Sequence, residues 1–525
     1  MAYHEALYLA VFLPIVMLLF QIIPQKLRPY LLLGASYVFF WSFSKYLIVY
    51  IIATSLVIYG VGLWIDKLQK KCKTACTDLS REEKKAVKSQ YLKREKAVLI
   101  GTIILIIGVL VFLKYSNFIM INLSSMIKAI KYQPVKLLIP IGISFYSLQA
   151  ISYVTDVYWE KIKAERNFGK VALFLSFFPH VLEGPICMYD EHMEALWKCD
   201  RITYDNFKHG FMRIGWGLMK KMVVADRLYK LVSTVYSGYE SYNGIVIIVT
   251  AICYTTQLYM EFSGCMDIVI GTAKIFGVTL QENFRQPFVS KNAGEFWRRW
   301  HISLGLWFKT YIFYPVSSSK LVKKWNKFAS KKMGKYVAKI GTSAFTLLPV
   351  WFCNGIWHGA EWGYLFYGLY YFVILLLEVI LEPVKEKLLS ILKIDASNKI
   401  WSAIMIFKTW IIIFTGELFF RAEKLDVGIH MFKSIFKDFS LKALWDGSLL
   451  HIGLSSADFA CVILFTMMVG IVGHFKEKQV DIYSKIDSWK TPARWALYYA
   501  VIFAVIIFGA YGTGYQKVDL IYAGF

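Results

Sequence analysis

Two histidines are the residues of this chain best suited to acid–base chemistry. His301 lies in the segment FWRRWHISL and His358 lies in the segment WFCNGIWHGAEW, and the chain around both segments is mostly apolar. An ionisable side chain inside a membrane is costly, so such residues are functional by default. Because an imidazole exchanges a proton near neutral pH, the two histidines predict acid–base catalysis at membrane depth.

The surroundings of His301 allow two interpretations. The four preceding residues are aromatic or cationic, namely Trp297, Arg298, Arg299 and Trp300. If the segment 296–307 is one helix, His301 shares a face with Trp297 and Leu304 and points inward, while the arginines can meet phosphate groups. The alternative is an interfacial anchor of tryptophans and arginines at the lipid headgroups. An anchor does not explain the histidine, so a functional His301 is favoured.

The second histidine has a polar neighbour at helical spacing. Asn354 lies four residues before His358, which makes the two side chains neighbours on a helix. An amide beside an imidazole can fix the tautomer that a general base requires. A packed, hydrogen-bonded structural histidine is the alternative, and these two residues alone leave it open.

Polar residues also interrupt the apolar segment 254–271, where Glu261, Ser263 and Asp267 stand. The two acids are separated by six positions, so they do not form a pair on one helix face. Ser263 followed by Gly264 favours a break in the helix. We expect these carboxylates to have a structural role, at helix ends or in ion pairs. The expected cationic partners are Arg285, Arg298 and Arg299.

The composition predicts a membrane protein. Of the 525 residues 57% are apolar and 18% are charged, and the mean hydropathy is +0.47. Apolar stretches recur from end to end, so we expect a single all-α polytopic domain over residues 1–525. The net charge of +24 is concentrated in short loops, which predicts contact with membrane lipids rather than with nucleic acid. The eight cysteines show no zinc-binding spacing, so no metal site is predicted.

The apolar stretches define the helices that must position the histidines. We expect about 11 full spans, together with re-entrant or interfacial helices. Broken backbone is expected at 176–186, where two prolines and a glycine accompany His180. The candidate helices lie near 5–23, 30–44, 46–65, 97–115, 136–158, 207–225, 244–262, 266–278, 341–356, 361–382, 400–420, 457–475 and 494–512.

The distribution of basic residues predicts the topology. The stretch 66–96 is very basic and should be a cytoplasmic loop. Counting back through three helices then places the N-terminus outside the cytoplasm. The last helix places the C-terminal tail, residues 513–525, outside as well.

The residues from Tyr254 to Pro315 resemble the membrane-bound O-acyltransferase (MBOAT) superfamily, specifically its bacterial alginate O-acetyltransferase-like branch. On its motifs, the histidine shared across the superfamily corresponds to His358, and the second histidine of the branch corresponds to His301. The chain departs from the branch at Glu261, where an aspartate is usual. Supporting stretches follow in order: IPIGISFYSLQAISYVTDVYW (139–159), LFLSFFPHVLEGPI (173–186), GLMKKMVVADRL (217–228), WHGAEW (357–362) and ELFFRAE (417–423).

The resemblance implies a ring of transmembrane helices around a thinned centre, with a funnel on each side that meets near the histidine. It implies an enzyme that takes acetyl from a cytoplasmic thioester, acetyl-CoA, and passes it outward for O-acetylation of a cell-surface polysaccharide. His358 would act as general base, and His301 as a second base or as the group that orients the thioester and stabilises its oxyanion. The supporting residues would be Trp297, Arg298, Arg299, Trp300, Asn354, Glu261, Ser263 and Asp267.

The resemblance also implies a partner protein and a location, and it leaves alternative functions open. An extracytoplasmic SGNH-type esterase or acetyltransferase is the implied partner, and a bacterial plasma membrane is the implied location. One alternative is the transfer of D-alanine or another acyl group to teichoic acid or a related envelope polymer. A transporter without covalent chemistry is a weaker alternative, because the sequence shows neither paired charges along a polar path nor internal repeats.

The C-terminal segment GYQKVDLIYAGF is aromatic and apolar, unlike most chain ends. We expect it to dock into the extracellular funnel, either as a packing anchor or as part of the chemistry. A terminal aromatic motif with a tyrosine recurs in related acyltransferase systems, and the resemblance makes Tyr522 a possible acyl relay. A phenol deprotonated by a histidine can carry acetyl as a reactive ester.

Overall fold

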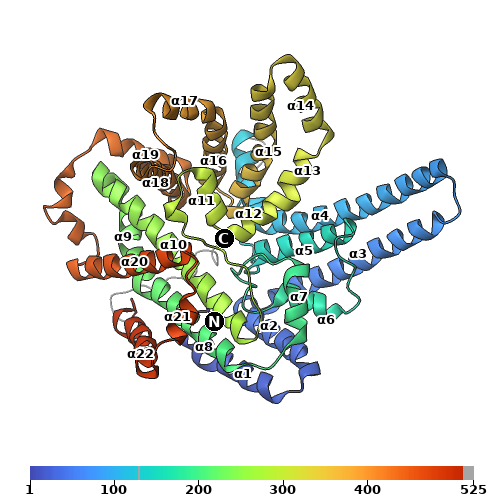
Figure 1. The fold of residues 1–525 in the computed structure, drawn as a ribbon, viewed down its shortest axis with the longest axis horizontal. Helices are drawn as coiled ribbons and strands as arrows, with labels where there is room; N and C mark the ends of the chain where they lie inside the picture. Colours follow the sequence, from blue (N-terminus) through green and yellow to red (C-terminus); the bar gives the residue numbers. More distant parts are fainter. Residues whose placement is uncertain (128–130, 512–525) are drawn as a thin grey trace. The chain divides into compact units, whose positions relative to one another are not determined.

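The computed structural model describes residues 1–127 and 131–511, and most of these residues are helical (Figure 1). Within these ranges the extended backbone forms one isolated antiparallel bridge, between Phe284 and Trp300. The all-α prediction is therefore confirmed.

Eight helical segments of the described residues are long and apolar enough to cross a membrane, which supports a multi-pass membrane protein. The expected number of full spans, about 11, stays a prediction. The eight segments are Gln25–Ala75, Arg81–Met126, Gly244–Ile275, Lys335–His358, Trp362–Ile380, Lys399–Ala422, Ser456–Glu477 and Thr491–Phe508.

The described residues fall into two compact units. Unit 1 comprises residues 1–213 and 269–281, and unit 2 comprises 214–268 and 282–511. Helices α8 (Tyr204–Leu218) and α10 (Gly244–Ile275) contribute residues to both units. The prediction that residues 1–525 form a single domain stays a prediction.

Unit 1 contains the N-terminal helices. They are η1 (Leu7–Phe12), α1 (Leu13–Ile22), η2 (Gln25–Leu27), α2 (Arg28–Ser44), η3 (Lys45–Leu47), α3 (Ile48–Ala75), α4 (Arg81–Met126), α5 (Ile143–Tyr158), α6 (Phe168–Ser176) and α7 (Tyr189–Lys198).

Unit 2 contains the later helices. They are η4 (Met219–Ala225), α9 (Asp226–Ser237), η5 (Tyr239–Ser241), η6 (Pro287–Val289), α11 (Ala293–Arg299), α12 (Ile302–Phe308), η7 (Lys309–Phe313), α13 (Tyr314–Ser317), α14 (Lys320–Lys332), α15 (Lys335–His358), α16 (Trp362–Ile380), α17 (Glu382–Leu392), α18 (Lys399–Ala422), α19 (Leu425–Lys437), η8 (Leu441–Leu444), η9 (Ser448–His451), α20 (Ser456–Glu477), α21 (Ile482–Asp487) and α22 (Thr491–Phe508).

Helices α3 and α4 lie side by side as a long hairpin (Figure 1). The expectation of a loop at 66–96 is wrong, because both helices continue through this basic stretch and only residues 76–80 connect them. Ser80 and Glu83 form a capping box that starts α4. The 46 residues of α4 make it about 70 Å long, more than twice the thickness of a hydrocarbon core.

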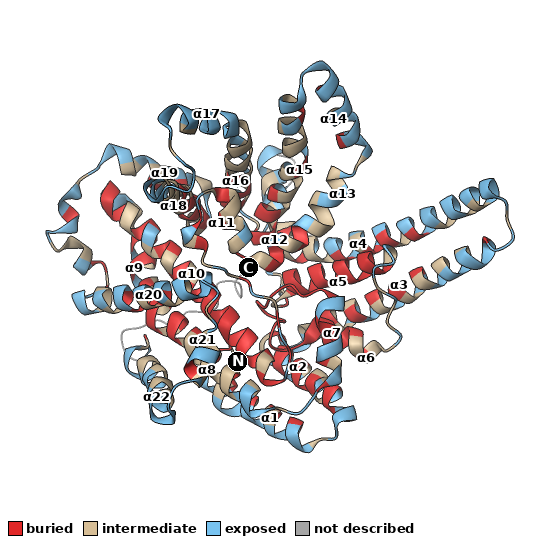
Figure 2. Ribbon diagram, in the orientation of Figure 1, coloured by how far each residue is buried: buried red, intermediate tan, exposed pale blue. Residues whose placement is uncertain are grey.

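Helix α10 runs without interruption through Ser263 and Gly264, so the expected break there is wrong. The glycine serves close packing instead. A Cβ at Gly264 would lie 2.8 Å from the carbonyl oxygen of Gly217 and 3.1 Å from Cβ of Lys220. The pair Ser263–Gly264 therefore marks a close contact between α10 and residues 217–220. Figure 2 shows most of α10 buried, in contrast to the exposed outer end of the α3–α4 hairpin.

The backbone at 177–188 is non-helical and buried, as the prolines predict. Within unit 1 it packs tightly, since a Cβ at Gly142 would lie 2.2 Å from the carbonyl oxygen of Val181. Irregular backbone of this kind is tolerated in a membrane protein where protein surrounds it. A re-entrant position within a membrane stays a prediction.

The close crossing of α15 and α16 in unit 2 holds the element that ends in His358. A Cβ at Gly368 would lie 2.3 Å from the carbonyl oxygen of Trp351, and one at Gly355 would lie 2.6 Å from that of Tyr364. Glycine at both positions lets the two backbones approach. This approach fixes the end of α15 against a core rich in aromatic residues.

Candidate active site

His301 occupies a break between α11 and α12. The expectation of one helix over 296–307 with Trp297, His301 and Leu304 on a common face is wrong. His301 has a left-handed backbone, with φ of 47°. The cause is the bridge to Phe284, because residues 283–285 exchange backbone hydrogen bonds with this stretch. Arg285 donates to the Arg299 carbonyl at 2.9 Å, and the Asn283 carbonyl accepts from Ile302 at 3.0 Å. A strained backbone at a non-glycine residue is characteristic of functional sites.

The imidazole of His301 is buried, at 3% exposure, and is held by Asn283. Its Nδ1 lies 3.3 Å from Oδ1 of Asn283. The same oxygen accepts hydrogen bonds from the backbone N–H of Ser303 at 3.0 Å and from its hydroxyl at 2.9 Å. Because this oxygen is an acceptor, Nδ1 must donate to it, and the neutral ring then carries its lone pair on Nε2. His301 is thereby prepared to accept a proton at Nε2.

His358 is the last residue of α15 and is also buried. Its ring centroid lies 4.9 Å from Trp357, 4.9 Å from Phe420 and 5.8 Å from Tyr367. The Trp357 ring also contacts His301, at 5.6 Å. The structure therefore brings the two predicted catalytic histidines together around a single tryptophan.

Asn354 and His358 lie one turn apart on α15, as their spacing predicts, and both are buried. Oδ1 of Asn354 has no hydrogen-bond partner among the described residues. A role of Asn354 in fixing the tautomer of His358 stays a prediction.

Glu417 on α18 is a buried acid that the sequence reasoning did not single out, although it stands in the quoted stretch ELFFRAE. It is 1% exposed, and its Oε1 accepts a hydrogen bond of 2.9 Å from the Tyr367 hydroxyl. The Tyr367 ring contacts His358, so Glu417 fixes the position of an aromatic ring that lies against the histidine. An acid within an apolar helix is the signal that could have identified it.

The acids of α10 are paired with lysines rather than with the expected arginines. Nζ of Lys220 lies 2.6 Å from Asp267 and 3.3 Å from the Ser263 hydroxyl, and Nζ of Lys221 lies 3.2 Å from Glu261. Both lysines belong to the π-helical segment η4 and are buried. Buried charges of opposite sign must be paired to be tolerated, so the pairs are consistent with the structural role expected of these acids.

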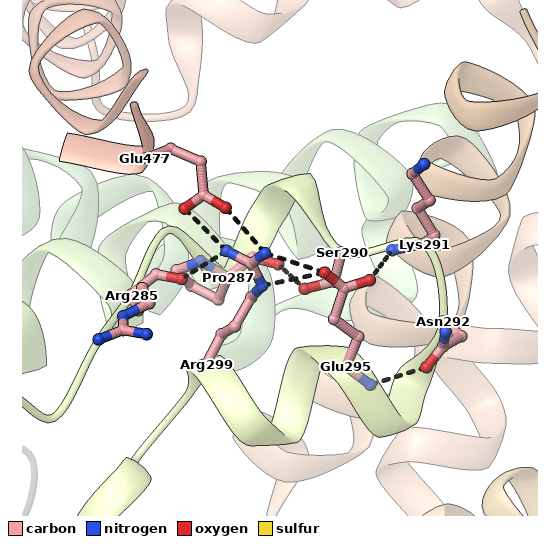
Figure 3. Close-up of polar contacts among 8 residues, drawn as sticks. All are labelled: Arg285, Pro287, Ser290, Lys291, Asn292, Glu295, Arg299 and Glu477. Carbon is pink, nitrogen blue, oxygen red and sulfur yellow. Dashed lines mark hydrogen bonds and ion pairs between the residues drawn. The ribbon is translucent and has the colours of Figure 1, made fainter. Parts of the chain in front are cut away.

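The arginines before His301 differ in their surroundings. Figure 3 shows Arg299 held by Glu477, with two bonds of 2.9 Å, and by Glu295 at 3.0 Å. The hydrogen bond to Glu477 raises the pKa of the Arg299 guanidinium. Arg299 is therefore engaged within the protein, whereas Arg298 is exposed. Of the two, Arg298 is the better placed to meet a phosphate.

The tryptophans beside these arginines belong to aromatic packing. Trp297 contacts Trp351 at 4.9 Å and Tyr371 at 4.8 Å, and Trp300 stacks on Phe296 at 5.4 Å. Trp297 packs α11 against α15 and α16, and neither tryptophan lies exposed as an interfacial belt would.

We expect Glu417→Ala to lower kcat roughly tenfold or more, because a wall of the His358 site loses its support and small displacements of catalytic groups are costly. Glu417→Gln keeps an acceptor for the Tyr367 hydroxyl and should retain most of the activity. The control is Glu386→Ala, which removes an exposed acid of α17. Steady-state kinetics together with thermal unfolding in detergent check this. Full activity of Glu417→Ala would exclude the supporting role.

The fold and the two buried histidines are those of a membrane-embedded acyltransferase. Residues 1–419 match the family model described as MBOAT, the membrane-bound O-acyltransferase family, and the chain belongs to this family. It is similar to a probable alginate O-acetylase of Azotobacter vinelandii, with 28% identity covering 88% of this chain and 84% of that protein. It is also similar to the peptidoglycan O-acetyltransferase of Helicobacter pylori, with 26% identity covering 67% of this chain and 66% of that protein.

A more distant likeness concerns the alternative acyl group. The teichoic acid D-alanyltransferase of Bacillus subtilis is 27% identical over 46% of this chain and 60% of that protein. The predicted family and enzyme class are confirmed, and a transporter without covalent chemistry is not supported. The predicted relay residue, Tyr522, lies outside the described residues, as does the tail from 513.

Proposed function

We propose that this protein transfers acetyl from cytoplasmic acetyl-CoA across a bacterial plasma membrane for O-acetylation of a cell-surface polysaccharide. The observation that carries the proposal is the meeting of two buried histidines, His301 and His358, on the Trp357 ring in a member of the MBOAT family. Relatives named for acetylation of alginate and of peptidoglycan support a polysaccharide as the final acceptor.

The transfer requires a base on the acceptor side. His358 takes the proton of the incoming hydroxyl, whose oxygen attacks the thioester carbonyl; the C–S bond then breaks, and the thiolate of CoA leaves with that proton. A positioned base of this kind contributes roughly 10²–10⁴-fold to the rate. Since Asn283 holds the Nδ1 proton of His301, we assign His301 as a second base acting through Nε2.

The proposal includes the surroundings of the reaction. Both chain ends face outward, and an SGNH-type esterase or acetyltransferase outside the cytoplasm completes the transfer to the polymer. The teichoic acid D-alanyltransferase relative makes D-alanyl transfer the second candidate, but it aligns over less than half of this chain.

The experiment is transfer of labelled acetyl by the purified protein in lipid nanodiscs. The reaction contains labelled acetyl-CoA as donor and either a polysaccharide or the SGNH-type partner protein as acceptor. We expect label to move to the acceptor at a rate proportional to the enzyme concentration. Label that moves only from a D-alanyl carrier-protein thioester would replace the acetyl assignment with the second candidate.

The same assay tests Tyr522 as an acyl relay. Tyr522→Phe removes only the hydroxyl, so we expect acetylation of the polymer to stop while the protein remains monodisperse. Intact-mass analysis of the wild-type protein after single turnover should find one acetyl group on the tail. Normal acetylation by Tyr522→Phe, with no acetyl on the tail, would leave the tail as a packing anchor.

A further inference from the structure

The outer part of the α3–α4 hairpin carries an excess of positive charge on a rigid frame. Residues 66–96 contain eleven lysines and arginines and five acids. A topology signal needs only the charges and is satisfied by a flexible loop. Here the charges stand instead on two continuous helices whose second member begins with a full capping box. Such order is unnecessary for topology and indicates a surface with a shape to preserve.

A groove of about 570 Å³ lies at the inner end of this charged surface, within unit 1. Its floor and walls are built mainly from cations and one aromatic ring. The residues lining it are Asp66, Lys67, Lys70, Lys71, Thr74, Ala75, Tyr91 and Arg166.

The groove is held open by fixed contacts at its edges. Nε2 of Gln69 donates to the carbonyl of Val157 at 3.1 Å, and Nζ of Lys73 lies 2.7 Å from Glu160, so α3 is tied to the end of α5. The Tyr59 hydroxyl donates to the Arg166 carbonyl at 2.9 Å, which fixes the opposite wall. These contacts use residues beside the groove and the backbone carbonyl of Arg166, so they leave the cationic side chains of the lining available.

The charge of the groove is largely uncompensated. Asp66 pairs with Lys70. Among the described residues, the side chains of Lys67, Lys71 and Arg166 make no ion pair, and all three are exposed. Tyr91, on α4, is half-buried and supplies an aromatic ring, which also has the Arg94 guanidinium carbon 5.8 Å from its centroid. Cations suit phosphate oxygens, and an aromatic face suits a planar base.

We propose that this groove binds a phosphate-bearing anion, and that its ligand is the 3′-phosphoadenosine diphosphate portion of the donor CoA. The proposal rests on the proposed function for the identity of the donor. Lys67, Lys71 and Arg166 contact the phosphates, and Tyr91 stacks on the adenine. Because Trp64, one turn before Lys67, is exposed as an interfacial tryptophan would be, a lipid phosphate is the other source of the same chemistry.

The test compares two double variants that remove the same charge. Lys67→Ala/Lys71→Ala removes two of the cations that line the groove. Lys84→Ala/Lys85→Ala instead removes two cations from a second hollow of the hairpin, which is lined by cations alone. We expect the groove variant to raise the KM for acetyl-CoA about tenfold with kcat unchanged, as the loss of two exposed phosphate contacts requires. The control variant should keep the wild-type KM. Acetyl-dephospho-CoA should be a poorer donor for the wild type only.

Direct binding separates this proposal from the catalytic one. The probe is adenosine 3′,5′-bisphosphate, titrated by calorimetry into His358→Ala protein in micelles free of anionic lipid. Binding that is lost in the groove variant and kept in the control supports a nucleotide site even without catalysis. The nucleotide site would be overturned if the groove variant transferred acetyl with an unchanged KM for acetyl-CoA and both variants bound the probe equally. Absence of transfer from acetyl-CoA by the wild type would instead refute the proposed donor.

A measurement of bound lipid tests whether the ligand of the groove is a lipid phosphate instead. Native mass spectrometry of protein from membranes containing phosphatidylglycerol counts the anionic lipids retained by each variant. If the groove holds a lipid headgroup, the groove variant alone loses a retained phosphatidylglycerol and its KM for acetyl-CoA does not change. That result overturns the nucleotide assignment, whereas equal lipid retention together with loss of the probe supports it.

Discussion

Replacement of His358 by alanine should reduce acetyl transfer at least a hundredfold, because the acceptor hydroxyl loses the base that removes its proton. The loss should appear in kcat, with the KM for acetyl-CoA nearly unchanged, since the ring contacts of His358 are with Trp357, Phe420 and Tyr367 rather than with the proposed nucleotide groove. The measurement is transfer of labelled acetyl by purified protein in nanodiscs, beside polymer acetylation in a complemented deletion strain.

The matched control for this variant is His451→Ala. His451 is exposed on η9, so its loss should leave both transfer and stability as in the wild type. Size-exclusion chromatography and thermal unfolding must show that His358→Ala is folded. Wild-type acetylation by a folded His358→Ala protein would end the assignment of His358 as the base.

Replacement of His301 by asparagine should reduce kcat by a similar order, about a hundredfold, through loss of the proton acceptor at Nε2. Asparagine is the informative replacement, because it tolerates the left-handed backbone that His301 adopts at φ of 47°. Alanine at the same position adds backbone strain of about 1 kcal/mol, so His301→Ala should be both inactive and less stable. Steady-state kinetics and thermal unfolding of the two variants separate chemistry from folding.

Asn283 provides the check on the assigned tautomer. Asn283→Ala removes the acceptor for Nδ1 and for Ser303, so the ring is free to place its proton on either nitrogen. We expect reduced kcat with His301 still present. If His301→Asn retains wild-type kinetics at every donor concentration, the RRWH motif is reduced to a packing element between α11 and α12.

The sequence located helices better than it located their ends. The apolar stretch 361–382 corresponds closely to α16, and 30–44 to α2. The stretches 244–262 and 266–278 were predicted as separate helices, yet they form the single helix α10, because Gly264 is required by a contact with Gly217 rather than by a turn. Hydropathy reports the apolar content of a segment and carries no information on such distant contacts.

The two candidate catalytic histidines could be singled out in the sequence, but the residues that contact them could not. His301 and His358 stand out because ionisable residues are rare in apolar sequence. The break at His301 depends on the bridge to Phe284, and the engagement of Arg299 depends on Glu477, which is distant in sequence. Local pattern therefore singled out the two candidate histidines, whereas Asn283, which contacts His301, and Glu417, which binds the Tyr367 hydroxyl beside His358, required the folded chain.

The lysine–carboxylate pairs of η4 and α10 also constrain how the protein is made. Lys220 leaves the ribosome 47 residues before its partner Asp267, whereas Lys221 has a second partner, Asp226, only 5 residues further along the chain. Until α10 follows, the Lys220 ammonium group, which is bound for a buried position, lacks the carboxylate that pairs with it, and burying an unpaired charge is strongly unfavourable. Segments η4 and α10 must therefore be integrated as a couple, and a nascent chain halted between them should stay accessible to cytoplasmic chaperones and proteases.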